Sequence, residues 1–120
     1  MIEHIGFEVS DLEATKRFYD AVFFALGARR MIENEHAVAY GINVPEFWIV
    51  VRGRPPGPGY GHIALQASGR VAVDAAFRAG LANGGEDDGA PGPRPQYGKR
   101  CYACYLRDPD GLRVEVVSPR

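Results

Sequence analysis

Residues 4–27 read HIGFEVSDLEATKRFYDAVFFALG, and this stretch decides the fold because it changes from a strand pattern to a helix pattern. In its first part apolar residues alternate with others. Ile5, Phe7 and Val9 fall on one face of an extended chain and His4 falls on the other. This alternation predicts a half-buried strand whose apolar face is covered by the element that follows.

The second part of the stretch predicts an amphipathic helix. Apolar residues recur at helical spacing from Leu12 to Leu26. Ser10, with Glu13 three positions later, forms a capping-box pattern, so we expect Ser10 to cap the helix. Gly27 follows the last apolar position and is expected to end the helix.

The same strand-and-helix order returns 58 positions later in the chain. The residues that match across this offset have the same expected roles in strand, cap and helix, which indicates a duplicated unit. The matched pairs are His4 and His62, Ile5 and Ile63, Ser10 and Ser68, Tyr19 and Phe77, and Gly27 and Gly85.

The predicted fold class is therefore α+β, a single domain made of two βαβββ modules that form a cupped mixed sheet. The modules span about 1–53 and 61–120, with a Pro/Gly-rich linker at 54–60. In the first module we expect strands at 30–33, 36–40 and 47–51. In the second we expect a strand at 62–67, a helix at 69–83, a Pro/Gly-rich loop at 88–99, and strands at 101–107 and 112–117.

Two short motifs near the end of the chain are predicted to be structural. The sequence Asp-Pro-Asp-Gly at 108–111 predicts a tight hairpin, because proline fixes φ and glycine accepts a positive φ. Cys101 and Cys104 form a C-x-x-C pair, which is typical of redox or zinc motifs. Their segment reads as a strand, in which residues three apart point to opposite faces, so we interpret them as small apolar residues of a sheet.

Composition excludes several partners. The chain has 120 residues, a net charge of −1 and a pI near 6.3, and it has no basic stripe, so a nucleic-acid partner is not expected. No apolar run approaches the roughly 18 residues of a membrane span. The first residues lack the pattern of a secretory signal, so we expect a cytoplasmic protein.

Three potential metal ligands are predicted to share the sheet face opposite the helices. His4 and His62 lie opposite the apolar face of each first strand, and Glu115 lies opposite Val114 and Val116 in the last strand. Two imidazoles and a carboxylate suit a divalent iron, manganese, zinc, nickel or cobalt ion. Three protein ligands also leave positions open for a small-molecule substrate. Taken singly, each could be an ordinary polar surface residue, and we read His36, in the polar run ENEH, in that way.

Further residues are candidates for contact with the substrate. By alternation Trp48 and Arg52 point to the same face as His4. Arg94 and Tyr97 lie in the predicted loop, and loops of this kind often supply contacts to anions. Trp48 could equally be a core aromatic that closes the interface between the modules, and the loop residues could be solvated.

The chain resembles the vicinal oxygen chelate superfamily over nearly its whole length. Three stretches carry the resemblance: residues 4–27, GHIALQA at 61–67, and the closing segment with DPDG followed four residues later by Glu115. This superfamily includes glyoxalase I, extradiol dioxygenases, fosfomycin-resistance transferases and bleomycin-binding proteins. The resemblance implies paired βαβββ modules, usually in a homodimer, and metal ligands at His4, His62 and Glu115.

The resemblance also leaves more than one function open. The fourth ligand position of glyoxalase I falls on Val50, which cannot bind metal, so the three-ligand set is more like the dioxygenases and the fosfomycin-type transferases. We expect a metal-dependent lyase, isomerase or transferase of glyoxalase-like type, with Glu115 as a ligand and a base. The alternatives are an iron(II) extradiol-type dioxygenase, with His36 or Tyr97 as its acid or base, and a non-catalytic binding protein like the bleomycin-binding members.

Overall fold

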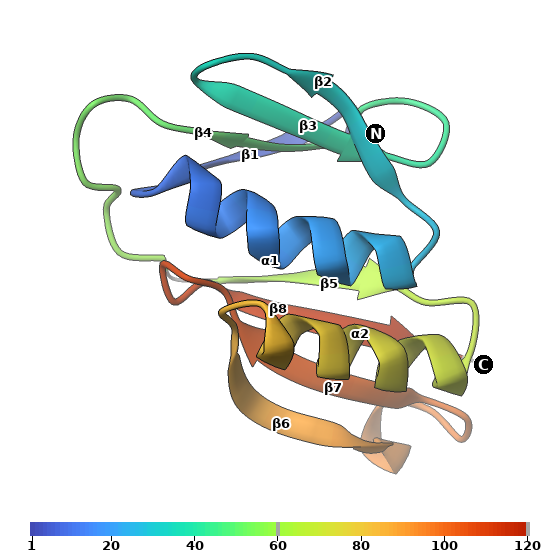
Figure 1. Ribbon diagram of the computed structural model, residues 1–120. Coiled ribbons are helices and arrows are strands. Elements are labelled where there is room, and N and C mark those ends of the chain that lie inside the picture. Colours follow the sequence, from blue (N-terminus) through green and yellow to red (C-terminus); the bar gives the residue numbers. More distant parts are fainter. Residues whose placement is uncertain (60, 120) are drawn as a thin grey trace.

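The computed structural model describes residues 1–59 and 61–119, and Figure 1 shows their arrangement. Tyr60 in the predicted linker and Arg120 at the end of the predicted second module lie outside the described residues. The first module consists of β1 (Ile5–Glu8), α1 (Leu12–Ala25), β2 (Arg29–Glu33), β3 (Ala37–Gly41) and β4 (Phe47–Val50). The second consists of β5 (His62–Gln66), α2 (Arg70–Ala82), β6 (Glu86–Pro93), the 3₁₀ helix η1 (Pro95–Tyr97), β7 (Tyr102–Arg107) and β8 (Arg113–Ser118).

Each module forms its own four-stranded mixed sheet. The strand order is β1-β4-β3-β2 in the first and β5-β8-β7-β6 in the second, so the two sheets repeat one topology. In each, the first strand pairs in parallel with the last, and the other neighbours are antiparallel. The predicted α+β fold class with two βαβββ modules is confirmed.

The two helices pack against each other between the sheets, with α1 against β2, β3 and β4 and α2 against β6, β7 and β8 (Figure 1). Gly80 of α2 lies where a Cβ atom would come within 2.7 Å of Leu106 and 3.2 Å of Phe18. A side chain at this position would therefore push the helix away from β7 and from α1. None of the helices in residues 1–59 and 61–119 is long and apolar enough to cross a bilayer.

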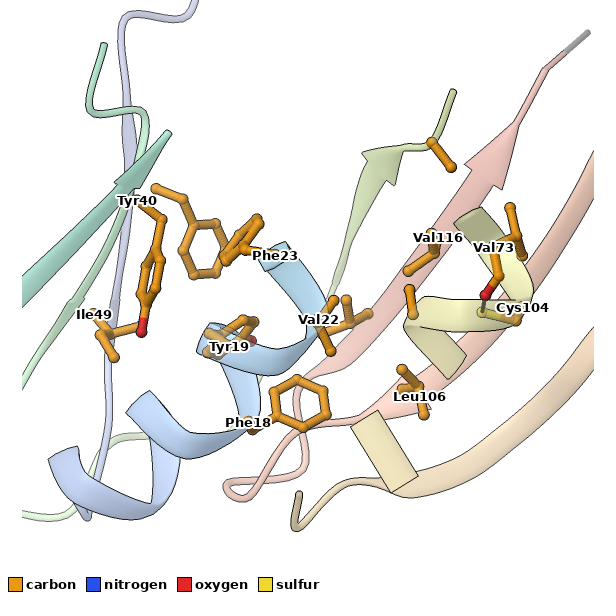
Figure 2. Close-up of a cluster of buried hydrophobic side chains, with 14 of the residues drawn as sticks. Phe18, Tyr19, Val22, Phe23, Tyr40, Ile49, Val73, Cys104, Leu106 and Val116 are labelled. Atoms are coloured by element: carbon orange, nitrogen blue, oxygen red, sulfur yellow. Dashed lines mark hydrogen bonds between the residues drawn. The ribbon is translucent and has the colours of Figure 1, made fainter. Parts of the chain in front are cut away.

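One continuous core joins the two modules (Figure 2). Side chains of α1 such as Phe18 and Val22 lie between residues of the first sheet, including Ile49, and residues of the second, including Leu106 and Val116. Because α1 is buried on both sides, the apolar faces of both sheets are turned inward. In the part of the chain that the structure describes, no α-helix lies on the opposite face of either sheet.

The Asp-Pro-Asp-Gly hairpin connects the modules as well as turning the chain. Gly111 has φ +87° and its N–H donates to the Asp108 carbonyl over 2.8 Å, so the predicted tight turn is present. The buried Asp108 carboxylate accepts a 2.7 Å hydrogen bond from the Tyr19 hydroxyl. The Asp110 carboxylate accepts hydrogen bonds from both the backbone N–H and the hydroxyl of Ser10.

The last contact explains one wrong prediction. Ser10 does not cap α1, because its hydroxyl is bonded to Asp110 of the other module. The N-cap is Asp11, whose carboxylate accepts from the Ala14 N–H over 3.1 Å. Gly27, with φ +80°, follows the end of the helix as expected.

A second prediction was wrong at the Pro/Gly-rich segment 88–99. Its first half belongs to the edge strand β6, and only its second half, around η1, lacks strand structure. The register of β6 against β7 shifts twice, between Asp87 and Gly89 and between Gly89 and Gly92. Such bulges break the alternation by which a strand is detected, and edge strands tolerate proline and glycine.

Cys101 and Cys104 are free and buried, as expected of small apolar residues. Cys104 lies in β7, and Cys101 directly precedes this strand. Burial raises the pKa of the Cys104 thiol to about 12. A thiol that remains protonated is a poor nucleophile and a poor metal ligand, so Cys104 is structural.

Candidate metal centre

The side chains of the first strand and of the last strand point to the faces predicted from alternation. Val114 and Val116 are fully buried in the core, and Glu115 between them points to the opposite face of the second sheet. In the same way Ile5 packs against the core and His4, just before β1, is exposed. Among the described residues, His62 and Glu115 therefore share a face of the second sheet on which no helix lies, and His4 is exposed just before β1.

His62 and Glu115 come together on the second sheet. They belong to the adjacent parallel strands β5 and β8, in which His62 is paired with Arg113 and Ala64 with Glu115. The imidazole Nε2 of His62 lies 3.4 Å from a carboxylate oxygen of Glu115. The Glu115 side chain is only 13% exposed, whereas that of His62 is 48% exposed. Solvent therefore reaches the pair mainly at the His62 imidazole.

This separation fits a shared metal ion. Imidazole nitrogens and carboxylate oxygens bind zinc-like ions at about 2.0–2.2 Å, so two ligand atoms of one ion lie roughly 3–3.5 Å apart. The His62 and Glu115 atoms are already at that spacing. The spacing of these two donor atoms therefore matches that of two ligands of one divalent ion.

His4 lies on the other sheet. Its ring stands at an edge-on angle to Trp48 of β4, with the two centroids 6.4 Å apart. In residues 1–59 and 61–119 no three His, Cys, Asp or Glu side chains gather closely enough to hold an ion. One chain by itself thus brings two of the three predicted ligands together and leaves the third on a separate sheet.

The predicted substrate residues divide between the two sheets. Trp48 is half-buried beside His4, and Arg52 lies 3.7 Å from the Glu8 carboxylate at the end of the same sheet. Arg94 lies on the second sheet, with its guanidinium carbon 5.8 Å from the centroid of the Tyr105 ring. Tyr97 projects from η1 and is 69% exposed.

Two residues beside the His62–Glu115 pair were missed from the sequence. Tyr105 is directly opposite Glu115 in the β7–β8 hairpin, and the Arg113 guanidinium carbon lies 3.9 Å from the Tyr105 ring centroid. Burial first, and then the nearby charge of Glu115, raise the pKa of the Tyr105 hydroxyl. Counting outward from the Asp-Pro-Asp-Gly turn would have placed Tyr105 on the face of Glu115, since the hairpin register follows from the turn.

Comparison with known proteins agrees with this fold and with the resemblance in sequence. Residues 1–116 match the Glyoxalase/Bleomycin resistance protein/Dioxygenase superfamily. The chain belongs to this superfamily. Among curated proteins, none matches the chain.

Solved structures share the fold over almost the whole chain. A glyoxalase/bleomycin resistance protein from Albidiferax ferrireducens T118 is 34% identical with a TM-score of 0.86, and 96% of each chain is covered. Fosfomycin resistance protein FosX from Mesorhizobium loti is 22% identical with a TM-score of 0.71, over 98% of this chain and 90% of that one. A lactoylglutathione lyase from Agrobacterium tumefaciens is 22% identical with a TM-score of 0.70, over 98% and 92%.

Proposed function

We propose that this protein is a metal-dependent enzyme of glyoxalase-like type that acts on a small molecule. The observation that carries the proposal is the His62–Glu115 pair, whose ligand atoms are 3.4 Å apart on a face that no helix covers. An imidazole nitrogen and a carboxylate oxygen are two of the ligand types that divalent ions such as zinc bind. His4 is proposed as the third ligand.

The third ligand is proposed to come from a second copy of the chain. Within one chain the helices hold the two sheets apart, so His4 and the His62–Glu115 pair are on different sheets. The proposed homodimer would put the uncovered face of the first sheet of one subunit beside the second sheet of its partner. Each of two equivalent sites would then receive His4 from one subunit and His62 with Glu115 from the other, as twofold symmetry requires.

Exposed apolar residues support this assembly. Ile32 of β2 is 40% exposed, and Ile42 and Val44 in the β3–β4 loop are each 55% exposed. Ile2, at 71% exposure, precedes His4 in the chain. All four side chains belong to the first module, and they favour a protein–protein contact, because apolar groups stay exposed at a cost in free energy.

In the proposed site, a metal would supply Lewis-acid chemistry at oxygen atoms of the substrate. The chain would contribute binding and proton handling. Trp48, beside His4, would provide an apolar wall for the substrate. Glu115 would be a ligand, and a carboxylate at this position can also accept a proton from a bound substrate.

The direct test is the metal content of protein purified without chelator. The wild-type chain is expected to bind close to one equivalent of iron, manganese, zinc, nickel or cobalt per subunit, and His62→Ala and Glu115→Gln are expected to bind almost none. His36→Ala is the matched control, because His36 is exposed and its backbone alone makes hydrogen bonds. Metal content equal in His62→Ala and in wild type would refute the metal site and favour a binding protein without chemistry.

A further inference from the structure

A cluster of arginines surrounds Tyr105 on the uncovered face of the second sheet. The guanidinium carbon of Arg113 lies 3.9 Å from the ring centroid and that of Arg94 lies 5.8 Å from it. Arg107, paired with Arg113 across the β7–β8 hairpin, belongs to the same cluster. Aromatic rings hold guanidinium groups by cation–π attraction, so Tyr105 fixes two positive charges in place.

The cluster has more positive than negative charge. Asp88 of β6 lies 2.9 Å from Nε of Arg113 and 3.1 Å from Nε of Arg107. In the part of the chain that the structure describes, no other carboxylate is within ion-pair distance of Arg94, Arg107 or Arg113. Asp88 therefore pairs with Arg107 and Arg113 but not with Arg94. Positive charge remains in excess even when the Glu115 carboxylate opposite Tyr105 is counted.

Several N–H donors of the cluster are also unused. Among the described residues, Arg94 donates only to the backbone carbonyls of Ala90 and Pro93, over 3.0 and 3.3 Å. Arg113 donates through Nε to Asp88, and the described residues provide no acceptor for its two terminal NH₂ groups. A guanidinium has five donors in a planar fork that matches two oxygens of a carboxylate or phosphate. Donors that remain free beside a net positive charge suit an oxyanion.

The cluster adjoins the proposed metal ligands. Tyr105 is the cross-strand partner of Glu115, and Arg113 is the cross-strand partner of His62. Directly opposed side chains on neighbouring strands have Cβ atoms about 5 Å apart. A molecule of a few carbon atoms therefore spans from the His62–Glu115 pair to the arginines.

From this arrangement we infer that the substrate carries an oxyanion, a carboxylate or a phosphate-type group, that Arg94 and Arg113 bind over Tyr105. The inference rests on the proposed function, because it assigns the substrate class of the same site. The arginines fix the charged end of the substrate, and the oxygen atoms that react lie toward His62 and Glu115. Neutral analogues of the same shape lose the charged contacts and are discriminated against.

The experiment uses the whole chain freed of metal by a chelator, so that a metal ion cannot bind the anion. Acetate and inorganic phosphate are the probes, and acetamide is the uncharged control. The Nε–H signals of the arginines are followed by NMR during each titration. We expect saturable shifts at Arg94 and Arg113 with at least one of the anions and none with acetamide.

Three variants complete the test. Arg94→Gln and Arg113→Gln are expected to weaken anion binding by about tenfold or more, since each removes hydrogen bonds between charged groups. Arg70→Gln is the matched control: Arg70 also lies over a tyrosine, 4.8 Å from the Tyr102 ring centroid, but α2 holds it on the helix side of the sheet. Arg94→Gln should fold normally, because the interactions that Arg94 makes with the described residues are hydrogen bonds to two backbone carbonyls and a contact with an aromatic ring.

The two proposals fail separately. Equal affinity in Arg94→Gln and wild type, or equal shifts with acetamide, overturns the oxyanion site whatever the metal content. Anion binding that depends on Arg94 in a chain that binds no metal supports the oxyanion site and contradicts the metal centre. The probe that binds more tightly identifies the headgroup as carboxylate or phosphate.

Discussion

The assembly proposed for the metal site can be tested by mixing two variants that each lack one proposed ligand. His4→Ala lacks the ligand on the first sheet, and His62→Ala lacks a ligand on the second. Each variant alone is expected to bind almost no metal. In a mixed dimer, however, the first sheet of the His62→Ala subunit and the second sheet of the His4→Ala subunit are both intact, so one of the two sites regains all three ligands.

The recovery follows from counting subunits. When equal amounts are unfolded, mixed and refolded, about half of the dimers contain one subunit of each kind, and each of these has one complete site out of two. About a quarter of all sites should therefore bind metal. The assay is the metal content per subunit after desalting, with each variant refolded alone as the baseline.

A second mixture provides the matched control. His62→Ala and Glu115→Ala both alter the second sheet, so in their mixed dimer each site still lacks one ligand, and the metal content should stay at the baseline. Recovery near a quarter in the first mixture with none in the second would establish a site shared between subunits. No recovery in either mixture, with both variants dimeric, would refute the shared site.

The remaining predictions concern the stability of the fold. Gly85→Ala should lower the free energy of unfolding by about 1–3 kcal/mol in urea denaturation, because a Cβ at this position would lie 2.4 Å from the Phe18 side chain. Gly57→Ala should have almost no effect, because a Cβ there would have no atom within 4 Å. Burial opposes ionisation of Asp20, but hydrogen bonds, chiefly from Arg30, outweigh it and lower the pKa of Asp20 below 3.8. The stabilisation from this ionised carboxylate should be lost as pH falls through the folded pKa of Asp20. The thermal unfolding midpoint of wild type should therefore fall more steeply below pH 3.8 than that of Asp20→Asn. Parallel curves for the two proteins would contradict this.

Much of the fold could be predicted where contacts are local. The strand β1 and the helix α1 follow from alternation and helical spacing within residues 4–27, and the tight turn follows from the Asp-Pro-Asp-Gly residues themselves. The cap of α1 could not be predicted in the same way. Ser10 has the chemistry of a cap, but its hydroxyl is bonded to Asp110, 100 positions away, and no local pattern indicates that contact.

The candidate site was predictable only in part. Strand phase put His62 and Glu115 on one face, and the two residues lie together there. Arg94 was identified as a residue for anion contacts, but its neighbours Arg113 and Tyr105 were missed, because their role depends on the register between β7 and β8.

The amino-acid sequence by itself determined the two modules, the inward face of each sheet and the residue types available for a metal, because alternation and helical periodicity are properties of a single chain segment. Only the tertiary structure decided how the modules meet. The apolar face of each sheet is buried under the helix of its own module. This holds whether the opposite face of the sheet meets the same chain or a second subunit, so the hydrophobic pattern of the sequence does not distinguish the two arrangements. The close packing of α1 on α2 separates the two sheets and leaves His4 apart from His62 and Glu115.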